Sequence, residues 1–329
     1  MPKAKRYQTG LLGVLLDRDQ QSKYYRIRRI LKGQSWEKSV RSPLTELGVN
    51  AAEGDYIIAV DGKPTNTMTN VYEALVNTAD RQVRLKLNAQ PREEGSREVV
   101  VIPTGDEAGL YYYNWVERNI QKVDSATGGK VGYIHVPDMG VRGLNEFVKH
   151  FYPQLRKRAV IIDVRGNGGG FVSQLVIERL RREIAMVDIA RNTVPNPDPN
   201  DMLLGPKVCM IDEFSASDGD IFPYRFKKYD LGKLVGKRTW GGVVGIRGTL
   251  PLLDGGFLNK PEFSRYGAKG EGWIMEGHGV DPDIVVDNDP AQEFAGIDAQ
   301  LNKAIEVILE ELKTKEESLP PVPPWPIKK

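Results

Sequence analysis

The sequence predicts a two-domain protein in which a β-rich domain precedes a layered α/β domain. Its 329 residues are enough for about two domains, because one domain takes ~150 residues on average. Before residue 104 the apolar runs are short and strand-like, whereas beyond it strand and helix patterns alternate. We therefore expect domains over residues 7–104 and 105–313. Residues 314–329 are too rich in proline for a helix and should form an extended tail.

The β-rich part contains runs of the length and pattern of single strands. Residues 83–87, Val-Arg-Leu-Lys-Leu, alternate strictly between apolar and charged side chains, which is typical of a half-buried strand. Polar residues 90–97 include Pro91 and Gly95 and predict a loop. Strands are expected over 11–16, 56–60, 83–87 and 99–102, and helices over 43–47 and 70–79.

The α/β part alternates between buried strands and amphipathic helices. Strands are expected over 130–137, 159–164, 208–211, 234–239 and 243–246. Helices are expected over 143–155, 174–182, from about Ser217, and over 292–313. The last helix has apolar residues on one face: Phe294, Ile297, Leu301, Ile305, Ile308 and Leu312.

Composition excludes several classes of function. The 46 Lys+Arg and 44 Asp+Glu residues nearly cancel to a net charge of +2, which argues against a nucleic-acid surface. No apolar run approaches the ~20 residues that span a bilayer, and the N-terminal residues lack the apolar core of a signal peptide. The single Cys209 excludes an internal disulfide, and His135, His150 and His278 lack metal-ligand spacing. We expect a cytoplasmic protein without a metal or organic cofactor.

A glycine-rich turn, VIIDVRGNGGGF, joins a buried strand to a helix. Glycine lets the backbone adopt positive φ and approach a ligand closely. Free N–H groups at a helix start bind negative charge, either a phosphate or the oxyanion of a tetrahedral intermediate. A purely structural turn is an equally good interpretation. A nucleotide loop is disfavoured because no Gly-Lys-Ser/Thr follows and the order differs from GxGxxG.

The stretch CMIDEFSASDGDIF places Ser217 where a strand gives way to a helix. In one interpretation, Ser215 and Asp218 form a capping box and Ser215 merely starts the helix. In the other, Ser217 presents its hydroxyl on a sharp turn, and the Asp218 N–H points to the same place as the N–H groups of the glycine turn. Two donors that converge on one point are what an oxyanion needs.

Two further segments carry candidate site residues. Glycines inside GKRTWGGVVGIRG would let an extended peptide pair with Gly245, Ile246 and Arg247, although a bulged edge strand is an equal alternative. Glu276 precedes a glycine-rich turn in GWIMEGHGVDPDIVV. Its carboxylate can orient a catalytic group, although most such residues are surface charges.

These four segments, in this order behind a β-rich domain, resemble the C-terminal part of the tricorn protease family, which is related to the C-terminal processing serine peptidases. The resemblance extends over about residues 7–313 and depends on SASDGDIF, GKRTWGGVVGI and GHGVDPDI. TGLLGVLL and EGDYIIAVDG are similar to a PDZ domain, with Gly10-Leu-Leu-Gly13 at the loop that binds a peptide carboxylate. The resemblance implies a PDZ-like domain followed by a crotonase-like (ClpP/crotonase) catalytic core.

The resemblance also implies a role for each motif residue. Ser217 would be the nucleophile of a serine endopeptidase, with the N–H groups of Gly170 and Asp218 as the oxyanion hole. Glu276 would belong to the charge-relay network. Asp188 would lie in the S1 pocket and favour Lys or Arg at P1. The substrate strand would be lined by Gly168, Gly169, Gly170, Gly245, Ile246 and Arg247.

The chain departs from the family pattern at the general base. Processing peptidases use a Lys soon after an Arg-Thr-aromatic-Gly stretch, but here residues 238–241 are followed by Gly-Val-Val. The tricorn-type base is a histidine upstream of the PDZ domain, and this chain begins almost where that domain begins. We therefore expect the base on an upstream domain outside this chain, with His278 as the least implausible resident substitute.

The partners and alternatives follow from this expectation. The family implies peptide substrates and a homo-oligomer, a hexamer. Without the base, the chain would be inactive or would serve as a peptide-binding PDZ module. An acyl-CoA enzyme of the crotonase type is a remote third interpretation, since no CoA-binding feature is evident.

Overall fold

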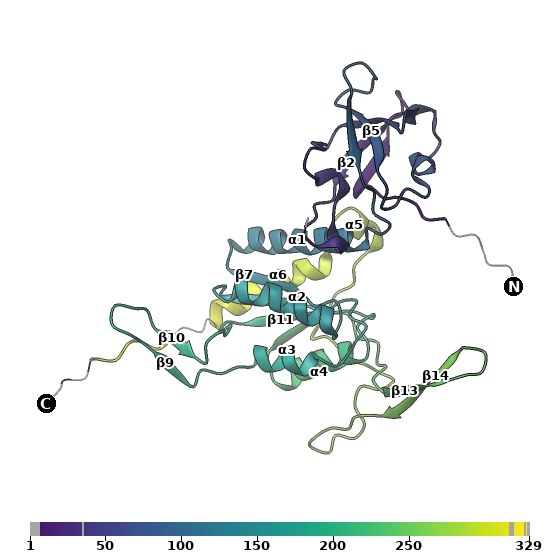
Figure 1. Ribbon diagram of the computed structural model, residues 1–329. Coiled ribbons are helices and arrows are strands. Elements are labelled where there is room, and N and C mark those ends of the chain that lie inside the picture. The colour runs from purple at the N-terminus through teal and green to yellow at the C-terminus, as the bar shows by residue number, and fades with distance from the viewer. Residues whose placement is uncertain (1–6, 35, 316–318, 326, 328–329) are drawn as a thin grey trace. The chain divides into compact units, whose positions relative to one another are not determined.

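The computed structural model describes residues 7–34, 36–315, 319–325 and 327. The chain divides into two compact units, Met1–Arg118 and Asn119–Lys329. The division falls inside helix α1 (Ala108–Thr127), which the sequence did not reveal (Figure 1). None of the helices in the described part of the chain is long and apolar enough to cross a membrane.

The first unit is built on one antiparallel sheet. Its strands follow the order β1-β2-β3-β5-β6, with β4 paired to β3. Their bounds are β1 Val14–Arg18, β2 Tyr25–Ile30, β3 Tyr56–Val60, β4 Lys63–Pro64, β5 Val83–Asn88 and β6 Arg97–Val101. β5 is half-buried as predicted, with Val83, Leu85 and Leu87 in the core. β1 lies at the edge of the sheet and, among the residues that the structure describes, pairs only with β2.

Three local predictions for this unit were inaccurate. The strand expected from residue 11 begins at Val14, because Leu11 and Leu12 belong to an irregular loop before it. The helices expected over 43–47 and 70–79 are short 3₁₀ turns, η2 Pro43–Thr45 and η4 Val71–Leu75. Two further 3₁₀ turns, η1 Lys38–Val40 and η3 Thr65–Thr67, were not predicted. β2 was not predicted, although its sequence YRIRRI has buried residues at alternate positions.

The second unit is a layered α/β structure around a parallel sheet. The strand order is β15-β12-β11-β8-β7, with all pairs parallel. The bounds are β7 Val131–His135, β8 Ala159–Asp163, β11 Lys207–Ile211, β12 Gly232–Gly236 and β15 Ile284–Val285. Every residue of β7 and β8 is buried, since helices cover both faces of a parallel sheet. The predicted order of a β-rich domain followed by a layered α/β domain is confirmed.

Helices form a layer on each side of this sheet, as Figure 1 shows. One layer holds α2 (Val141–Phe151), α3 (Ser173–Leu180) and α4 (Asp218–Lys228). The other holds α6 (Ala299–Thr314) and the later part of α1. The long helix expected over 292–313 is instead two, α5 (Pro290–Phe294) and α6, because Gly296 adopts φ +88° between them.

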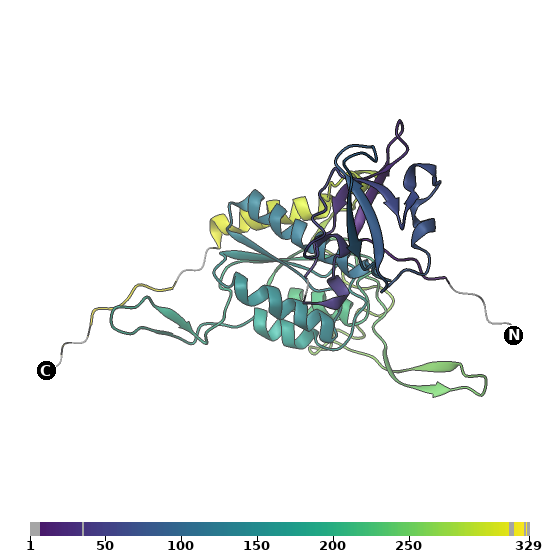
Figure 2. The ribbon, with the colours of Figure 1, turned by 45° about the horizontal axis from the view of Figure 1, so that its top comes forward.

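Two hairpins project from this layered body, on different sides of it (Figure 2). β9 (Met186–Asp188) pairs with β10 (Asn196–Asp198), and β13 (Gly245–Pro251) pairs with β14 (Phe257–Phe263). The expected strand 243–246 is therefore displaced, since its first two residues precede β13.

Candidate active site

Ser217 lies on a strained turn between β11 and α4. Its φ of 55° and ψ of −118° are unusual for a residue with a side chain, and such a conformation costs about 1–3 kcal/mol. The Ser217 side chain does not cap the helix. The alternative in which Ser215 starts the helix is wrong, because Ser215 is buried and its hydroxyl donates to the carbonyl of Val164, 2.9 Å away. The turn leaves the Ser217 hydroxyl at the carboxyl-terminal edge of the sheet.

The glycine turn packs directly against the Ser217 turn. A Cβ atom on Gly169 would lie 2.7 Å from the Ser217 Cβ and 2.9 Å from the Asp218 nitrogen. Only a residue without a side chain fits there, and Gly169 also adopts φ +100°. The backbone of the glycine turn and the backbone at the start of α4 therefore lie side by side.

Asn167, which the sequence analysis overlooked, joins these two turns. Its carbonyl accepts the Ala216 N–H at 2.8 Å, and its Oδ1 accepts the Gly169 N–H at 3.0 Å. Its Nδ2 donates to the carbonyl of Val136 at 2.8 Å, and the residue is fully buried. The signal available in the sequence was an Asn between two glycines after a buried strand.

Gly170 is held by the segment that follows β7. The Met139 N–H donates to the Gly169 carbonyl at 2.8 Å, and the Met139 carbonyl accepts the Phe171 N–H at 2.7 Å. A Cβ on Gly170 would lie 2.0 Å from the Met139 carbonyl oxygen. Within the described residues, neither the Gly170 N–H nor the Asp218 N–H has a hydrogen-bond acceptor. Both amides are therefore available to a negatively charged oxygen.

The Asp218 side chain is hydrogen-bonded within the described part of the chain, unlike the Asp218 backbone N–H. Its carboxylate is buried and accepts the Ser173 N–H at 2.9 Å and the Ser173 hydroxyl at 2.5 Å. Arg225 in turn donates to the Ser173 hydroxyl at 2.6 Å. The carboxylate thus ties the start of α3 to the start of α4.

The segment before β13 is held by two carboxylates. Asp220 accepts the Gly241 N–H at 2.8 Å, and burial raises the pKa of Asp220 although the Thr239 hydroxyl and nearby amides oppose the shift. Glu276 accepts the N–H groups of Val243 and Val244 at 2.7 and 2.8 Å. Glu276 therefore positions the chain that leads into β13, and Asp220 is a second residue that the sequence analysis overlooked.

The predicted substrate strand lies at the start of the projecting β13. Gly245 stands opposite Phe263, and a Cβ on Gly245 would overlap the Phe263 ring. Ile246 and Arg247 are exposed. Among the described residues β13 pairs only with β14, so its other edge is unpaired.

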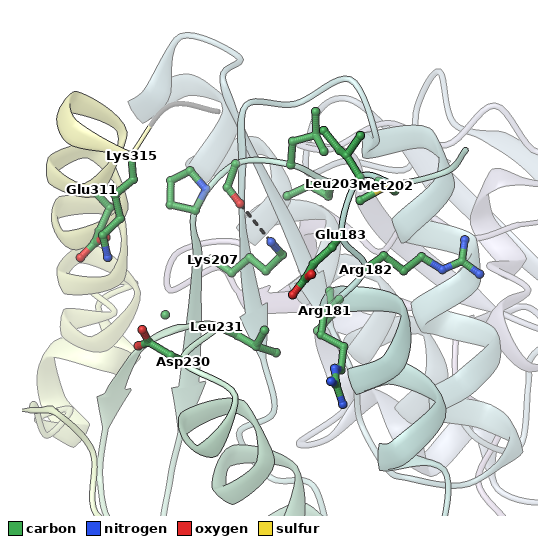
Figure 3. A pocket seen from close by; sticks show the side chains of 16 residues that line it. Arg181, Arg182, Glu183, Met202, Leu203, Lys207, Asp230, Leu231, Glu311 and Lys315 are labelled. Carbon is green, nitrogen blue, oxygen red and sulfur yellow. Dashed lines mark hydrogen bonds and ion pairs between the residues drawn. The ribbon is translucent and has the colours of Figure 1, made fainter. Parts of the chain in front are cut away.

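Asp188 and Ser217 lie at opposite ends of the parallel strands. Ser217 follows the carboxyl-terminal end of β11, whereas Asp188 lies beyond the end at which β11 and β12 begin. α3 begins beside Asp218 and ends at Leu180, which lines a cavity of about 480 Å³ at the amino-terminal starts of β11 and β12. Figure 3 shows this cavity, with charges of both signs from Arg181, Lys207 and Glu311 around it. Asp188 is exposed in β9 beyond this edge. Within one chain, the structure does not bring Asp188 to Ser217.

Each histidine has a partner other than Ser217. His135 is buried and donates to the Arg165 carbonyl at 3.1 Å, and burial lowers its pKa although Asp163 opposes the shift. His150 lies 3.3 Å from Glu146. His278 lies 2.7 Å from Asp281 on an exposed turn. In the part of the chain that the structure describes, no histidine ring is hydrogen-bonded to Ser217.

Comparisons with known proteins match both units. The Tricorn protease PDZ domain family matches residues 10–106, and Peptidase family S41 matches residues 130–286. The Tricorn protease of Thermoplasma volcanium is 40% identical over 296 residues, which is 90% of this chain and 28% of that protein. The chain belongs to the tricorn protease family.

Two other relatives agree with this assignment. Tricorn protease homolog 1 of Streptomyces coelicolor is 38% identical over 95% of this chain and 29% of its own length. A crystal structure of the tricorn protease superposes with a TM-score of 0.84 at 36% identity, covering 93% of this chain and 29% of that one. This chain thus spans less than a third of the length of these tricorn proteases.

Proposed function

We propose that the second unit is the core of a tricorn-type serine endopeptidase. The Ser217 hydroxyl attacks the carbonyl carbon of a peptide bond, and the N–H groups of Gly170 and Asp218 bind the oxyanion that forms. The observation that carries the proposal is the strained Ser217 turn packed against Gly169, with two acceptor-free amides beside it. Preorganised amides of this kind are worth about 10²–10³ in turnover each.

The substrate is an extended peptide that runs between the glycine turn and β13. Gly168, Gly169 and Gly170 offer backbone without side chains on one side. The unpaired edge of Gly245, Ile246 and Arg247 offers strand hydrogen bonds on the other. Glu276 holds the chain before this edge by accepting the N–H groups of Val243 and Val244, so we assign it a positioning role.

The general base is a histidine supplied from outside this chain, on an upstream domain or a separate polypeptide. The three resident rings are held by Arg165, Glu146 and Asp281. A serine without a base in hydrogen-bond reach is a poor nucleophile. The incoming imidazole takes the Ser217 proton during attack and returns it to the leaving amine.

A preference for Lys or Arg at P1 requires Asp188 from a second copy of the chain. Its exposed hairpin projects from the edge of the sheet opposite Ser217. In a homo-oligomer, such as the hexamer of the family, this hairpin can reach the site of a neighbour. Asp188→Lys should abolish the preference, and an unchanged preference would remove Asp188 from the S1 pocket.

The proposal is tested with a fluorogenic peptide that carries Lys at P1 and with a fluorophosphonate probe. We expect the chain alone to be nearly inactive. Addition of a tricorn fragment that bears the upstream histidine should restore cleavage in the wild type and not in Ser217→Ala. Cleavage by the chain alone that depends on Ser217 would instead locate the base here, and His278→Ala would then be the next variant.

A peptide-binding module without catalysis is the second candidate. It is favoured by the absence of a histidine at Ser217 among the described residues and by the free edge of β1. Failure of the histidine-bearing fragment to restore any Ser217-dependent cleavage would favour this candidate.

A further inference from the structure

The loop before β1 has its amide groups engaged by the first unit itself. The Gly10 N–H donates to the Leu75 carbonyl and the Leu11 N–H to the Thr104 carbonyl, both at 2.7 Å. The Gly13 N–H donates to the Glu107 Oε2 at 3.1 Å. In a PDZ domain, backbone amides at this loop capture the terminal carboxylate of a peptide that adds to the sheet edge. Here a side-chain carboxylate from residue 107 is already hydrogen-bonded to one of them.

Glu107 is half-buried, and its carboxylate interacts with residues of two other segments. Burial raises the pKa of Glu107, and the Gly13 N–H opposes the shift. Burial also raises the pKa of Tyr72 in η4, and the Glu107 charge adds to that shift. Glu107 is therefore hydrogen-bonded to Gly13, the residue before β1, and its charge acts on Tyr72 in η4.

Leu110 and Ser42 complete this arrangement. Leu110 is fully buried, and its Cδ1 would lie 3.1 Å from a Cβ on Gly13. The Ser42 Oγ would lie 3.2 Å from the same point. Ser42 is 2% exposed, and its hydroxyl has no hydrogen-bond partner in the described part of the chain. A buried hydroxyl without a partner costs free energy, so the loop retains an unused donor beside the carboxylate position.

We propose that the first turn of α1 closes the carboxylate site of the PDZ-like unit, with Glu107 in the place of a peptide's terminal carboxylate and Leu110 beside it. The displacing ligand is a peptide with a free C-terminal carboxylate and an apolar last residue. Its carboxylate takes over the Gly13 N–H and gains the Ser42 hydroxyl, while its backbone pairs with the free edge of β1. The charge at Gly13 stays the same through the exchange. This inference is independent of Ser217 chemistry.

The exchange also reaches the helix that the two units share. α1 continues to Asn119, whose Nδ2 lies 3.0 Å from the Tyr133 hydroxyl, and to Val123 in the core of the second unit. Release of Glu107 frees the first turn of this helix. Amide hydrogen exchange over residues 107–112 should therefore become faster when a peptide binds.

The test is fluorescence anisotropy with the full chain and a labelled hexapeptide that ends in leucine, as the free acid and as the C-terminal amide. Glu107→Ala removes the internal competitor, and we expect it to bind the free acid at least tenfold more tightly than the wild type does. The amide should bind weakly to both. The matched control is Glu98→Ala, which removes an exposed carboxylate of the same unit and should match the wild type. Adding Ser42→Ala to Glu107→Ala should weaken binding of the free acid again.

Two outcomes overturn the proposal: equal affinity of wild type and Glu107→Ala for the free acid, or no binding by either. If Glu107→Ala does not fold, Glu107→Gln keeps the shape without the charge and should show a smaller gain in affinity. A second readout is the NMR shift of the Gly13 amide with pH. In the wild type it should follow a carboxyl group whose pKa is above the usual range for glutamate, and this response should be absent in Glu107→Gln.

Discussion

The two roles assigned to Asp218 can be separated by mutation. Its carboxylate accepts two hydrogen bonds from Ser173, at 2.9 and 2.5 Å, whereas its backbone N–H, which has no acceptor among the described residues, is the proposed oxyanion donor. A hydrogen bond to a charged group is worth about 1.5–3 kcal/mol. Asp218→Ala loses both hydrogen bonds and leaves the Ser173 N–H and hydroxyl without their acceptor, so we expect a loss of about 3–6 kcal/mol in the free energy of unfolding.

Asp218→Asn keeps the shape and one acceptor, so its expected loss is about 1.5–3 kcal/mol. Urea titration followed by far-UV circular dichroism measures both variants. The control is Glu178→Ala, which removes an exposed carboxylate of α3 and should change stability by less than about 0.5 kcal/mol. Because the backbone N–H is unchanged, the folded Asn variant should react with a fluorophosphonate at the wild-type rate when the histidine-bearing tricorn fragment is added to both proteins. Slower labelling by more than tenfold in fully folded protein would refute the assignment of the side chain to structure alone.

Two further predictions concern residues near the site. Gly169→Ala places a methyl group 2.7 Å from the Ser217 Cβ at a φ of +100°. With the histidine-bearing fragment present, we expect at least a 100-fold loss of fluorophosphonate labelling, comparable to loss of an oxyanion donor, and near-normal labelling would contradict the close approach. His135 has a lowered pKa because it is buried, so the unfolded chain takes up a proton at a higher pH than the folded chain does. Stability should therefore fall as pH drops below about 6.5, and the fall should be shallower in His135→Gln, with parallel pH profiles as the result against it.

A buried ion pair, Asp163 with Arg165, was not predicted from the sequence and also contributes to the dependence of stability on pH. Asp163 is fully buried, where burial alone would raise its pKa, but the Arg165 guanidinium outweighs this and holds the pKa below the usual range. Arg165 also binds Asp298 at the start of α6 with Nη2 to Oδ2 at 3.0 Å. Removal of one partner from such a group typically costs about 3–5 kcal/mol, so the pH comparison must keep Asp163 and Arg165 intact.

Periodicity along the chain determined the fold class. β5 alternates between apolar and polar residues because one face of its sheet is buried, and β7 and β8 are buried throughout because both faces of their sheet are covered. The ends of helices were predicted less accurately where the backbone angle of one residue ends a helix. The positive φ of Gly296 divides the predicted last helix in this way. α1 was not predicted because its apolar residues are spaced among tyrosines and polar residues.

The candidate nucleophile and the glycine turn were also readable, because strand-to-helix turns have local requirements. Ser217 and Asp218 lie against Gly169, the residue before Gly170, while the catalytic roles of Ser217, Asp218 and Gly170 stay predictions. The positions of Asp188 and the histidines depend on how far-apart segments pack, and the sequence carries no local signal for this. Residue type alone could not place Asp188 at the other edge of the sheet.

The sequence by itself determined the two domains, their order, and the residues from which an oxyanion site can be built. Only the tertiary structure decided that Asn167 joins the two turns and that Asp218 points its carboxylate to Ser173. It also decided that Glu107 reaches Gly13, 94 positions away. Periodicity and turn chemistry act over a few neighbouring residues, whereas a hydrogen bond between distant residues exists only once packing has brought both groups within about 3 Å.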